Sequence, residues 1–345
     1  MKKNIWYLFF VLMLTFALAA CGGDDSEPAS STDSDAESAE NGSDDAGGDA
    51  ALDYPTKDIQ IFVGHGAGGG TDTFARTMAK LMEEDLGVNI NVINMEGAGG
   101  VIAKENGAKE PADGYTIVAS SALAVQVATG TNTNAHLNVY KAIARVQSDT
   151  LSLQVKSGTY ETIDDFIEDA KARPGEIRVG GTGIGTMDDM VFNMFKSATG
   201  LDIIFVPFEG AGDMHAALLG GHIEAMMEEP GPTISQIEAG EITPLLFFTE
   251  ERIEEFPDVP TSVEKGWDIT NGVERSFLIR KDTPQEIVDF LEAAVKRAYD
   301  SEEYKEYERK SFLHLREGWM GSEEYTQKLQ EDIEKFTEIV ASLEQ

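Results

Sequence analysis

Two glycine-rich segments, each placed between a short β-rich run and a helical stretch, constrain the fold of this chain most strongly. The first, Gly64-His65-Gly66-Ala67-Gly68-Gly69-Gly70-Thr71-Asp72, follows the apolar run 59–63. The second, Gly180-Gly181-Thr182-Gly183-Ile184-Gly185-Thr186, follows the run 177–179. Alternating strands and helices are typical of α/β proteins with a mainly parallel sheet. Because ligands of such sheets bind beyond the carboxyl ends of strands, two such ends predict a cleft between two domains.

Further short apolar runs and helical patterns continue this alternation. We expect strands at 59–63, 88–93, 115–119, 151–155, 177–179 and 203–206. We expect helices at 71–86, 99–108, 162–172, up to 195, 214–219 and from 322 onward. Thr162 is a good N-cap for its helix, and Pro284 suits the first turn of another.

The first glycine segment formally satisfies the dinucleotide fingerprint, through Gly64, Gly66 and Gly69. An exported chain has no supply of nicotinamide cofactor, so we expect no cofactor here. Glycines still let the backbone approach a ligand, and the first N–H groups of the next helix have no intrahelical partner, which favours a bound carboxylate. Asp72 could act either as an N-terminal cap or as a ligand contact.

The N-terminal residues predict export and a lipid anchor. Lys2 and Lys3 precede a run that is apolar up to Ala20 except for Thr15, as in a signal peptide of residues 1–20. The segment Leu18-Ala19-Ala20-Cys21 resembles the lipobox of bacterial lipoproteins, which predicts lipidation of Cys21 and attachment to the cell membrane from outside. Residues 22–53 hold eleven Asp or Glu and no Lys or Arg. We therefore expect residues 21–53 to form an acidic disordered tether.

The charge balance excludes several classes of protein. The chain has 345 residues, with 27 Lys and Arg, 62 Asp and Glu, and a formal net charge of -35. Nucleic-acid binding needs clustered cations, so no nucleic-acid partner is expected. A single Cys forms no intramolecular disulfide, and the five His show no ligand spacing, so we expect no metal site. There is also no G-x-S-x-G, H-E-x-x-H or P-loop motif.

Six segments, in this order, carry a resemblance to a known family. They are the first glycine segment with its flanks Phe62-Val63 and Thr73-Phe74-Ala75-Arg76, then Gly97-Ala98-Gly99-Gly100, Pro111-Ala112-Asp113-Gly114-Tyr115-Thr116, Val206-Pro207-Phe208-Glu209-Gly210, Leu218-Leu219-Gly220-Gly221-His222 and Phe256-Pro257-Asp258-Val259-Pro260-Thr261. With them the chain resembles the substrate-binding receptors of tripartite tricarboxylate transporters, the Bug receptor family.

The resemblance implies a type II periplasmic-binding-protein fold, with two α/β domains joined by hinge strands and a ligand cleft between them. Domain I would comprise residues 54–150 plus 275–345 and domain II residues 151–274, with hinge strands near Leu151 and Phe277. A receptor of this family is a monomer and not an enzyme. It captures a small carboxylate, such as a di- or tricarboxylate, and delivers it to the large and small membrane subunits of a permease.

The resemblance also implies which residues contact the ligand, mainly through backbone amides and hydroxyls. These are Gly66, Ala67, Gly68, Gly69, Thr71, Asp72, Ser120, Ser121, Thr182, Gly183, Gly185, Thr186, Asp189, Phe208, Glu209 and Gly210. Phe208 could wall the ligand or belong to the core.

Just after the second glycine segment, where members of the family commonly have a His, this chain has Asp188 and Asp189. These carboxylates could be solvated residues of a first helical turn, favoured by the helix dipole. Alternatively one of them pairs with an ammonium, and the ligand is an amino acid. The acid pair Glu228-Glu229 is expected to be solvated. Two further alternatives are a sensory receptor of the same fold and an exported hydrolase whose catalytic groups meet only in the folded chain.

Overall fold

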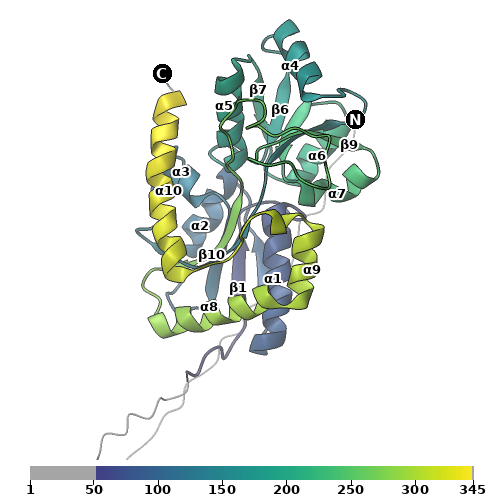
Figure 1. The fold of residues 1–345 in the computed structure, drawn as a ribbon. Helices are drawn as coiled ribbons and strands as arrows, with labels where there is room; N and C mark the ends of the chain where they lie inside the picture. Colours follow the sequence, from purple (N-terminus) through teal and green to yellow (C-terminus); the bar gives the residue numbers. More distant parts are fainter. Residues whose placement is uncertain (1–51, 344–345) are drawn as a thin grey trace, which may run out of the picture. The chain divides into compact units, whose positions relative to one another are not determined.

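The computed structural model describes residues 52–343 (Figure 1). The predicted signal peptide, Cys21 and all but the last two residues of the predicted tether lie outside the described residues. Within residues 52–343, no helix has both the length and the apolar character needed to cross a membrane.

The described chain alternates between strands and helices from its first element. The strands are β1 (Ile59–Val63), β2 (Ile90–Asn94), β3 (Thr116–Ser120), β4 (Tyr140–Ser148), β5 (Ser152–Lys156), β6 (Arg178–Gly181), β7 (Ile204–Pro207), β8 (Ala225–Glu228), β9 (Ile242–Phe247), β10 (Glu274–Arg280) and β11 (Met320–Gly321). The α-helices are α1 (Gly70–Leu86), α2 (Val101–Gly107), α3 (Leu123–Ala128), α4 (Ile163–Ala172), α5 (Met187–Thr199), α6 (Ala211–Leu219), α7 (Pro230–Glu238), α8 (Gln285–Asp300), α9 (Glu302–Lys310) and α10 (Ser322–Leu343). Short 3-10 helices lie at Ala98–Gly100 and Leu313–Leu315.

These strands form two mixed sheets. The six-stranded sheet has the order β11-β4-β10-β3-β1-β2, and the five-stranded sheet has the order β7-β6-β8-β5-β9. β1 is parallel to both of its neighbours and β6 to both of its own, whereas β10 and β5 are antiparallel to theirs. The expectation of mainly parallel sheets is therefore wrong. β5 is the first strand after the chain crosses from the six-stranded to the five-stranded sheet, and β10 is the first strand after it crosses back. Both are antiparallel to their neighbours.

The first glycine segment is positioned by a helix that packs firmly on the six-stranded sheet. In α1 the apolar residues Phe74, Met78 and Met82 recur every fourth position and are all fully buried, as expected for one face of an amphipathic helix. The ring of Phe74 stacks on that of Phe277 in β10, with centroids 4.7 Å apart. Each such side chain contributes about 1.5–3 kcal/mol through burial, so the start of α1 is held rigidly against the sheet.

The long helix α10 covers the other side of this sheet. It packs against β4 and along α3, and it also contacts α5, whose strand partners belong to the five-stranded sheet. Figure 1 shows α10, in yellow, running beside α3. Leu329 and Phe336 are its buried apolar anchors. α10 thus lies beside the region where the chain passes from one sheet to the other.

Candidate functional site

The first glycine segment is shaped by Asp72. The N-cap of α1, Gly69, has no side chain to satisfy the first turn. Instead Oδ2 of buried Asp72 accepts the Gly68 N–H at 2.9 Å, and the same carboxylate binds Arg76 and Asn94. Burial acts to raise the pKa of Asp72, but the bonds from Arg76, Gly68 and Asn94 hold it below its usual value. The Asp72 carboxylate is therefore engaged by donors of the protein itself.

The second glycine segment is shaped by two acids in the first turn of α5. Oδ2 of Asp188 accepts both the N–H and the hydroxyl of Thr182, each at 2.7 Å. Oδ2 of Asp189 accepts the Gly185 N–H at 2.9 Å. Asp188 is only 5% exposed, so the interpretation of both acids as solvated residues is wrong for Asp188. Asp189 is half-buried.

Loops of the two sheets meet through glycine backbones. A Cβ on Gly183 would lie 2.9 Å from Cα of Gly99, closer than real Cβ contacts. A Cβ on Gly66 would lie 3.4 Å from Cα of Gly210. Because neither pair carries a side chain, the strand-end loops close on one another and leave a small space between them.

That space, which we call the cleft cavity, has a volume of about 30 Å³. Five residues named from the sequence line it: Gly69, Thr71, Ser121, Thr182 and Thr186. Ten other residues complete its wall: His65, Gly70, Ala122, Met187, Asp188, Ala211, Glu228, Glu229, Val273 and Arg275. The remaining predicted contacts do not line it: Gly66, Ala67, Gly68, Asp72, Ser120, Gly183, Gly185, Asp189, Phe208, Glu209 and Gly210.

Some of these other predicted contacts have clear places of their own. Phe208 is half-buried and packs in a small apolar cluster with Met214 and Ile223. Glu209 is exposed, and Gly210 is the N-cap of α6. Ser120 lines a different, larger cavity described below.

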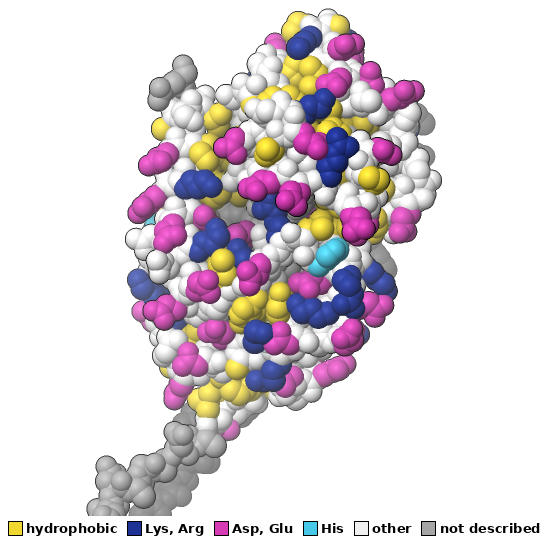
Figure 2. All heavy atoms as spheres, in the orientation of Figure 1, with side chains coloured by type: hydrophobic (Ala, Val, Ile, Leu, Met, Phe, Trp, Pro, Cys, Tyr) yellow, Lys and Arg dark blue, Asp and Glu magenta, His cyan; other side chains and the backbone are white. Residues whose placement is uncertain are grey.

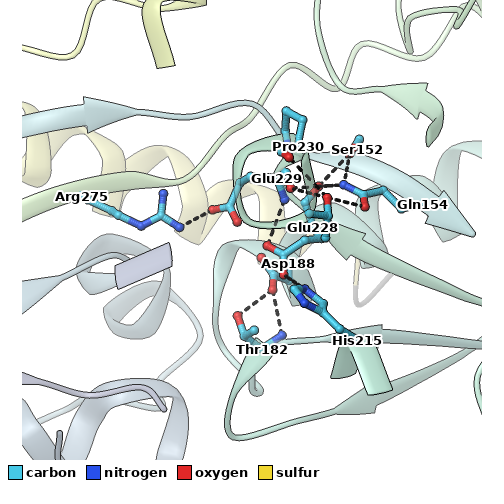
Figure 3. Close-up of polar contacts among 10 residues, drawn as sticks. Ser152, Gln154, Thr182, Asp188, His215, Glu228, Glu229, Pro230 and Arg275 are labelled. Atoms are coloured by element: carbon cyan, nitrogen blue, oxygen red, sulfur yellow. Dashed lines mark hydrogen bonds and ion pairs between the residues drawn. The ribbon is translucent and has the colours of Figure 1, made fainter. Parts of the chain in front are cut away.

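Buried charges dominate the cleft cavity (Figure 3). Nη2 of Arg275 lies 2.5 Å from Oε1 of Glu229, and Nη1 lies 3.2 Å from Oδ2 of Asp149. Figure 3 shows Asp188, Glu228 and Glu229 gathered on the same side of Arg275. All five charged side chains are at most 5% exposed. Within residues 52–343, no group of His, Cys, Asp and Glu is arranged to hold a metal ion.

The protonation of these acids is set by burial and by their mutual repulsion. Burial, followed by the nearby Glu229, raises the pKa of Asp188 to about 6 and that of Asp149 to about 7. The same two causes raise the pKa of Glu228 well above its usual value. Burial opposes ionisation of Glu229 as well, but the Arg275 guanidinium keeps the pKa of Glu229 below its usual value. Glu229 is therefore the ionised partner of Arg275.

The expectation that Glu228 and Glu229 are solvated is wrong. Glu228 ends β8, a strand with neighbours on both sides, and every residue of β8 is buried. Nε2 of His215 lies 2.8 Å from Oε2 of Glu228, and Oε1 of Glu228 accepts the Glu229 N–H at 3.0 Å. The apolar run Ala225-Met226-Met227 before the acids was the sequence signal of a buried strand.

A second cavity, which we call the α10 cavity, has a volume of about 250 Å³ and adjoins the first. The two share Ser121, Ala122 and Met187 in their walls. Its other lining residues come mainly from α3, from α10 and from residues 270–272, which precede β10. They also include Ser120, Ser148, Glu274 and Arg316. In Figure 2, Lys and Arg side chains border a hollow on the face beside α10.

The fold has two mixed β-sheets with helices packed on them, and glycine-rich loops at the strand ends enclose a polar cavity. These features define a solute-binding protein of the periplasmic-binding-protein type. Residues 74–344 match the family model described as "Tripartite tricarboxylate transporter family receptor". The chain belongs to this family of solute-binding receptors, which are not enzymes. The family and the two-domain α/β fold expected from the sequence are both confirmed.

Relatives of known name or structure agree with this membership. "Protein BugT" of Bordetella pertussis strain Tohama I is 31% identical over 226 residues, which cover 62% of this chain and 67% of that protein. The structure of MatC from Rhodopseudomonas palustris with bound malate is similar with a TM-score of 0.76 at 23% identity, covering 83% of this chain and 100% of that one. The R. palustris protein Rpa4515 with adipate also has a TM-score of 0.76, at 24% identity, covering 84% of this chain and 98% of that one. At these identities the structures establish the fold alone.

Proposed function

We propose that this chain is an extracytoplasmic receptor that captures a small carboxylate and delivers it to a tripartite tricarboxylate transporter. The observation that carries the proposal is the cleft cavity, enclosed between the two glycine segments of a protein of this receptor family. Malate in MatC and adipate in Rpa4515 support a small organic acid as the ligand class. The large and small membrane subunits of the permease would receive the ligand.

The donors for a carboxylate come from the cleft itself. Gly70 and Thr71 open α1, where N–H groups have no partner inside the helix. The hydroxyl of Ser121 lies at the wall shared by both cavities. The volume of the cleft cavity is room for about two water molecules. A ligand must therefore enter while the sheets are further apart, by a hinge motion of domain I (54–150 plus 275–345) against domain II (151–274).

Binding is tested by calorimetry on the full chain in detergent, with malate, adipate and citrate as probes. We expect one site per chain and a rise in melting temperature that follows the ligand concentration, since a ligand bound only by the folded state stabilises it. The control is a neutral sugar of similar size. If neither these carboxylates nor any amino acid binds at millimolar concentration, the proposal fails.

The anchor and the permease are tested separately. Mass spectrometry of the chain purified from its membrane should find a lipid on Cys21 and no residues 1–20, and Cys21→Ser should release the protein from the membrane. Mild crosslinking in cells should capture two membrane subunits, one large and one small. An unmodified Cys21 would contradict the anchor while leaving the receptor proposal intact.

An amino acid is the second candidate ligand, and one observation favours it. Asp188, Glu228 and Glu229 all line the cleft cavity, against a single cation, Arg275. The oxygens of these carboxyl groups accept hydrogen bonds from an ammonium group, and the ionised ones also attract its charge and repel a ligand carboxylate.

A further inference from the structure

The cleft cavity is lined by more carboxyl groups than the protein pairs with cations. Its one cation, Arg275, is held between Glu229 and Asp149. Within residues 52–343, neither Asp188 nor Glu228 has a Lys or Arg within ion-pair distance. Glu228 has only the half-buried His215, and both bonds from Thr182 reach the same oxygen of Asp188, Oδ2. Oδ1 of Asp188 is thus free to accept a bond from a ligand.

The adjoining α10 cavity has the opposite character. Three of its lining residues are cations, Arg316, Lys328 and Lys335, against the two acids Glu274 and Asp332. Lys328 is neutralised by both of these acids. Arg316 donates only to neutral oxygens, of Thr150, Phe248 and Thr270. No ion pair of Lys335 is found in the described part of the chain. The charges of Arg316 and Lys335 are therefore available to an anion.

A buried hydroxyl in the α10 cavity also lacks a partner. Ser120 is 2% exposed and lines this cavity, and its Oγ makes no hydrogen bond. An unpaired buried polar atom costs about 1–3 kcal/mol, so it is best explained as a group that a ligand satisfies. A carboxylate would accept a hydrogen bond from this hydroxyl and would meet the two available cations at the same time.

We propose that the ligand is a zwitterion whose ammonium and carboxylate ends are separated by a short chain and occupy the two cavities. The ammonium lies in the cleft cavity against Asp188 and Glu228. The carboxylate lies in the α10 cavity near Ser120, Arg316 and Lys335, and the connecting chain passes Ser121 and Ala122. This inference rests on the proposed function, because it assumes that the cleft is the ligand site. It places the carboxylate on the Ser121 side rather than at the start of α1.

The test compares ligands that differ only in charge. Calorimetry on the full chain would use four five-carbon probes: 5-aminopentanoate, glutarate, 1,5-diaminopentane and 2-aminopentanoate, followed by their four-, six- and seven-carbon counterparts. At the best length, the ligand with one charge of each sign at opposite ends should bind at least about tenfold more tightly than the other three. The 2-amino acid controls for a zwitterion whose charges are adjacent.

Two substitutions assign the ends of the ligand. Asp188→Asn keeps an acceptor for Thr182 and should weaken binding of the terminal amino acid about tenfold or more while strengthening glutarate relative to it. Lys335→Gln should weaken both the amino acid and glutarate. The matched controls are Asp213→Asn, an exposed acid in the first turn of α6, and Lys171→Gln, an exposed residue of α4. Melting temperatures would show that each variant is folded.

Three results overturn the inference and leave the proposed function standing. One is that glutarate or its homologues bind as tightly as the terminal amino acids. Another is that malate, adipate or citrate binds but no terminal amino acid does. The third is that Asp188→Asn and Asp213→Asn change binding of the terminal amino acid alike. If no carboxylate or amino acid of either panel binds, the proposed function fails together with the inference.

Discussion

Arg275 and Glu229 form a buried ion pair, 2.5 Å from Nη2 to Oε1, that joins the two sheets of the receptor. Arg275 lies in β10 of the six-stranded sheet, and Glu229 directly follows β8 of the five-stranded sheet. The guanidinium lies so close to the start of α1 that a Cβ on Gly70 would be 2.1 Å from Nη2. One side chain thus connects β10, the first glycine segment and the end of β8, and it holds the cleft in the arrangement described.

Replacing this arginine should be strongly destabilising. Arg275→Met leaves Glu229 and Asp149 buried without their cation, and breaking a buried pair in this way typically costs about 3–5 kcal/mol. Urea unfolding at pH 7 would measure the loss. Arg252→Met is the control, because Arg252 pairs with Glu264 at the surface, where an ion pair contributes at most about 1 kcal/mol. Equal losses in the two variants would contradict the assigned role of Arg275.

Asp188→Asn should change how stability depends on pH. The pKa of folded Asp188 is raised to about 6 by burial and by Glu229, against the opposing hydrogen bonds from Thr182 and the charge of Arg275, while that of an unfolded Asp is near 3.8. Between these values the folded state holds a proton that the unfolded state has released, so stability falls as pH rises through this window. Asp188→Asn removes this loss, so its stability relative to the native chain should increase by about 2 kcal/mol between pH 4 and pH 7.

Urea unfolding at several pH values in this range would give the two curves for Asp188. Asp213→Asn is the control, since Asp213 has the same place in the first turn of its helix but is exposed. Its curve should run parallel to that of the native chain. A parallel curve for Asp188→Asn as well would mean that Asp188 has the same pKa in the folded and the unfolded state.

Local signals in the sequence predict much of the fold. β1 lies at the expected residues, α4 has the expected Thr162 cap, and α10 begins at Ser322 as expected. These elements are marked by apolar periodicity or by a capping residue, both of which act over a few positions. β4 was not predicted, because Lys141, Arg145 and Gln147 interrupt its apolar pattern. Arg145 is nevertheless buried, since Glu274 and the carbonyl of Gly318 satisfy it from distant parts of the chain.

The residues of the candidate site also fall into those that the sequence predicts and those that it does not. The glycine segments and Ser121 could be named from the sequence because each is a strand end, recognisable from its neighbours. Arg275, Glu228 and Glu229 could not, because a charged residue is ordinarily placed at the surface. Their burial depends on the ion pair between Arg275 in β10 and Glu229 at the end of β8, which are 46 residues apart in the sequence. That ion pair therefore decides which charged side chains line the cleft.

Lys104 should make the receptor more stable as the solution becomes alkaline. It is 2% exposed, its Nζ donates only to the Gly100 carbonyl at 3.3 Å, and burial lowers its pKa from 10.5 to about 7. The charged or titratable side chain facing it is His65, whose own pKa is lowered to about 4, first by burial. Between pH 7 and 10 the unfolded state binds a proton that the folded state lacks, so stability rises with pH. The expected rise is about 3 kcal/mol.

Lys104→Met should abolish this rise, because the methionine fills the same space without titrating. Guanidinium unfolding between pH 7.5 and 9.5 would measure it, with Lys171→Met, at an exposed position of α4, as the control. If Lys104→Met keeps the full pH dependence of the native chain, the rise has another origin.

Gly64→Ala should damage the site through its backbone, whereas Gly212→Ala should not. A Cβ on Gly64 would lie 2.3 Å from Cα of Gly100 and 2.9 Å from the Gly100 carbonyl oxygen, so two backbone segments would have to separate. Overpacking of this kind costs about 1–3 kcal/mol, and it would shift the first glycine segment at its first residue.

A Cβ on Gly212, in the first turn of α6, would have no atom within 4 Å. There alanine should stabilise the chain by up to about 1 kcal/mol through its better helix propensity. Urea unfolding gives both changes, and calorimetry with a bound carboxylate should show weaker binding for Gly64→Ala only. Native stability in Gly64→Ala would mean that the loops at residues 64 and 100 move apart freely, and the rigid positioning of the cleft would be wrong.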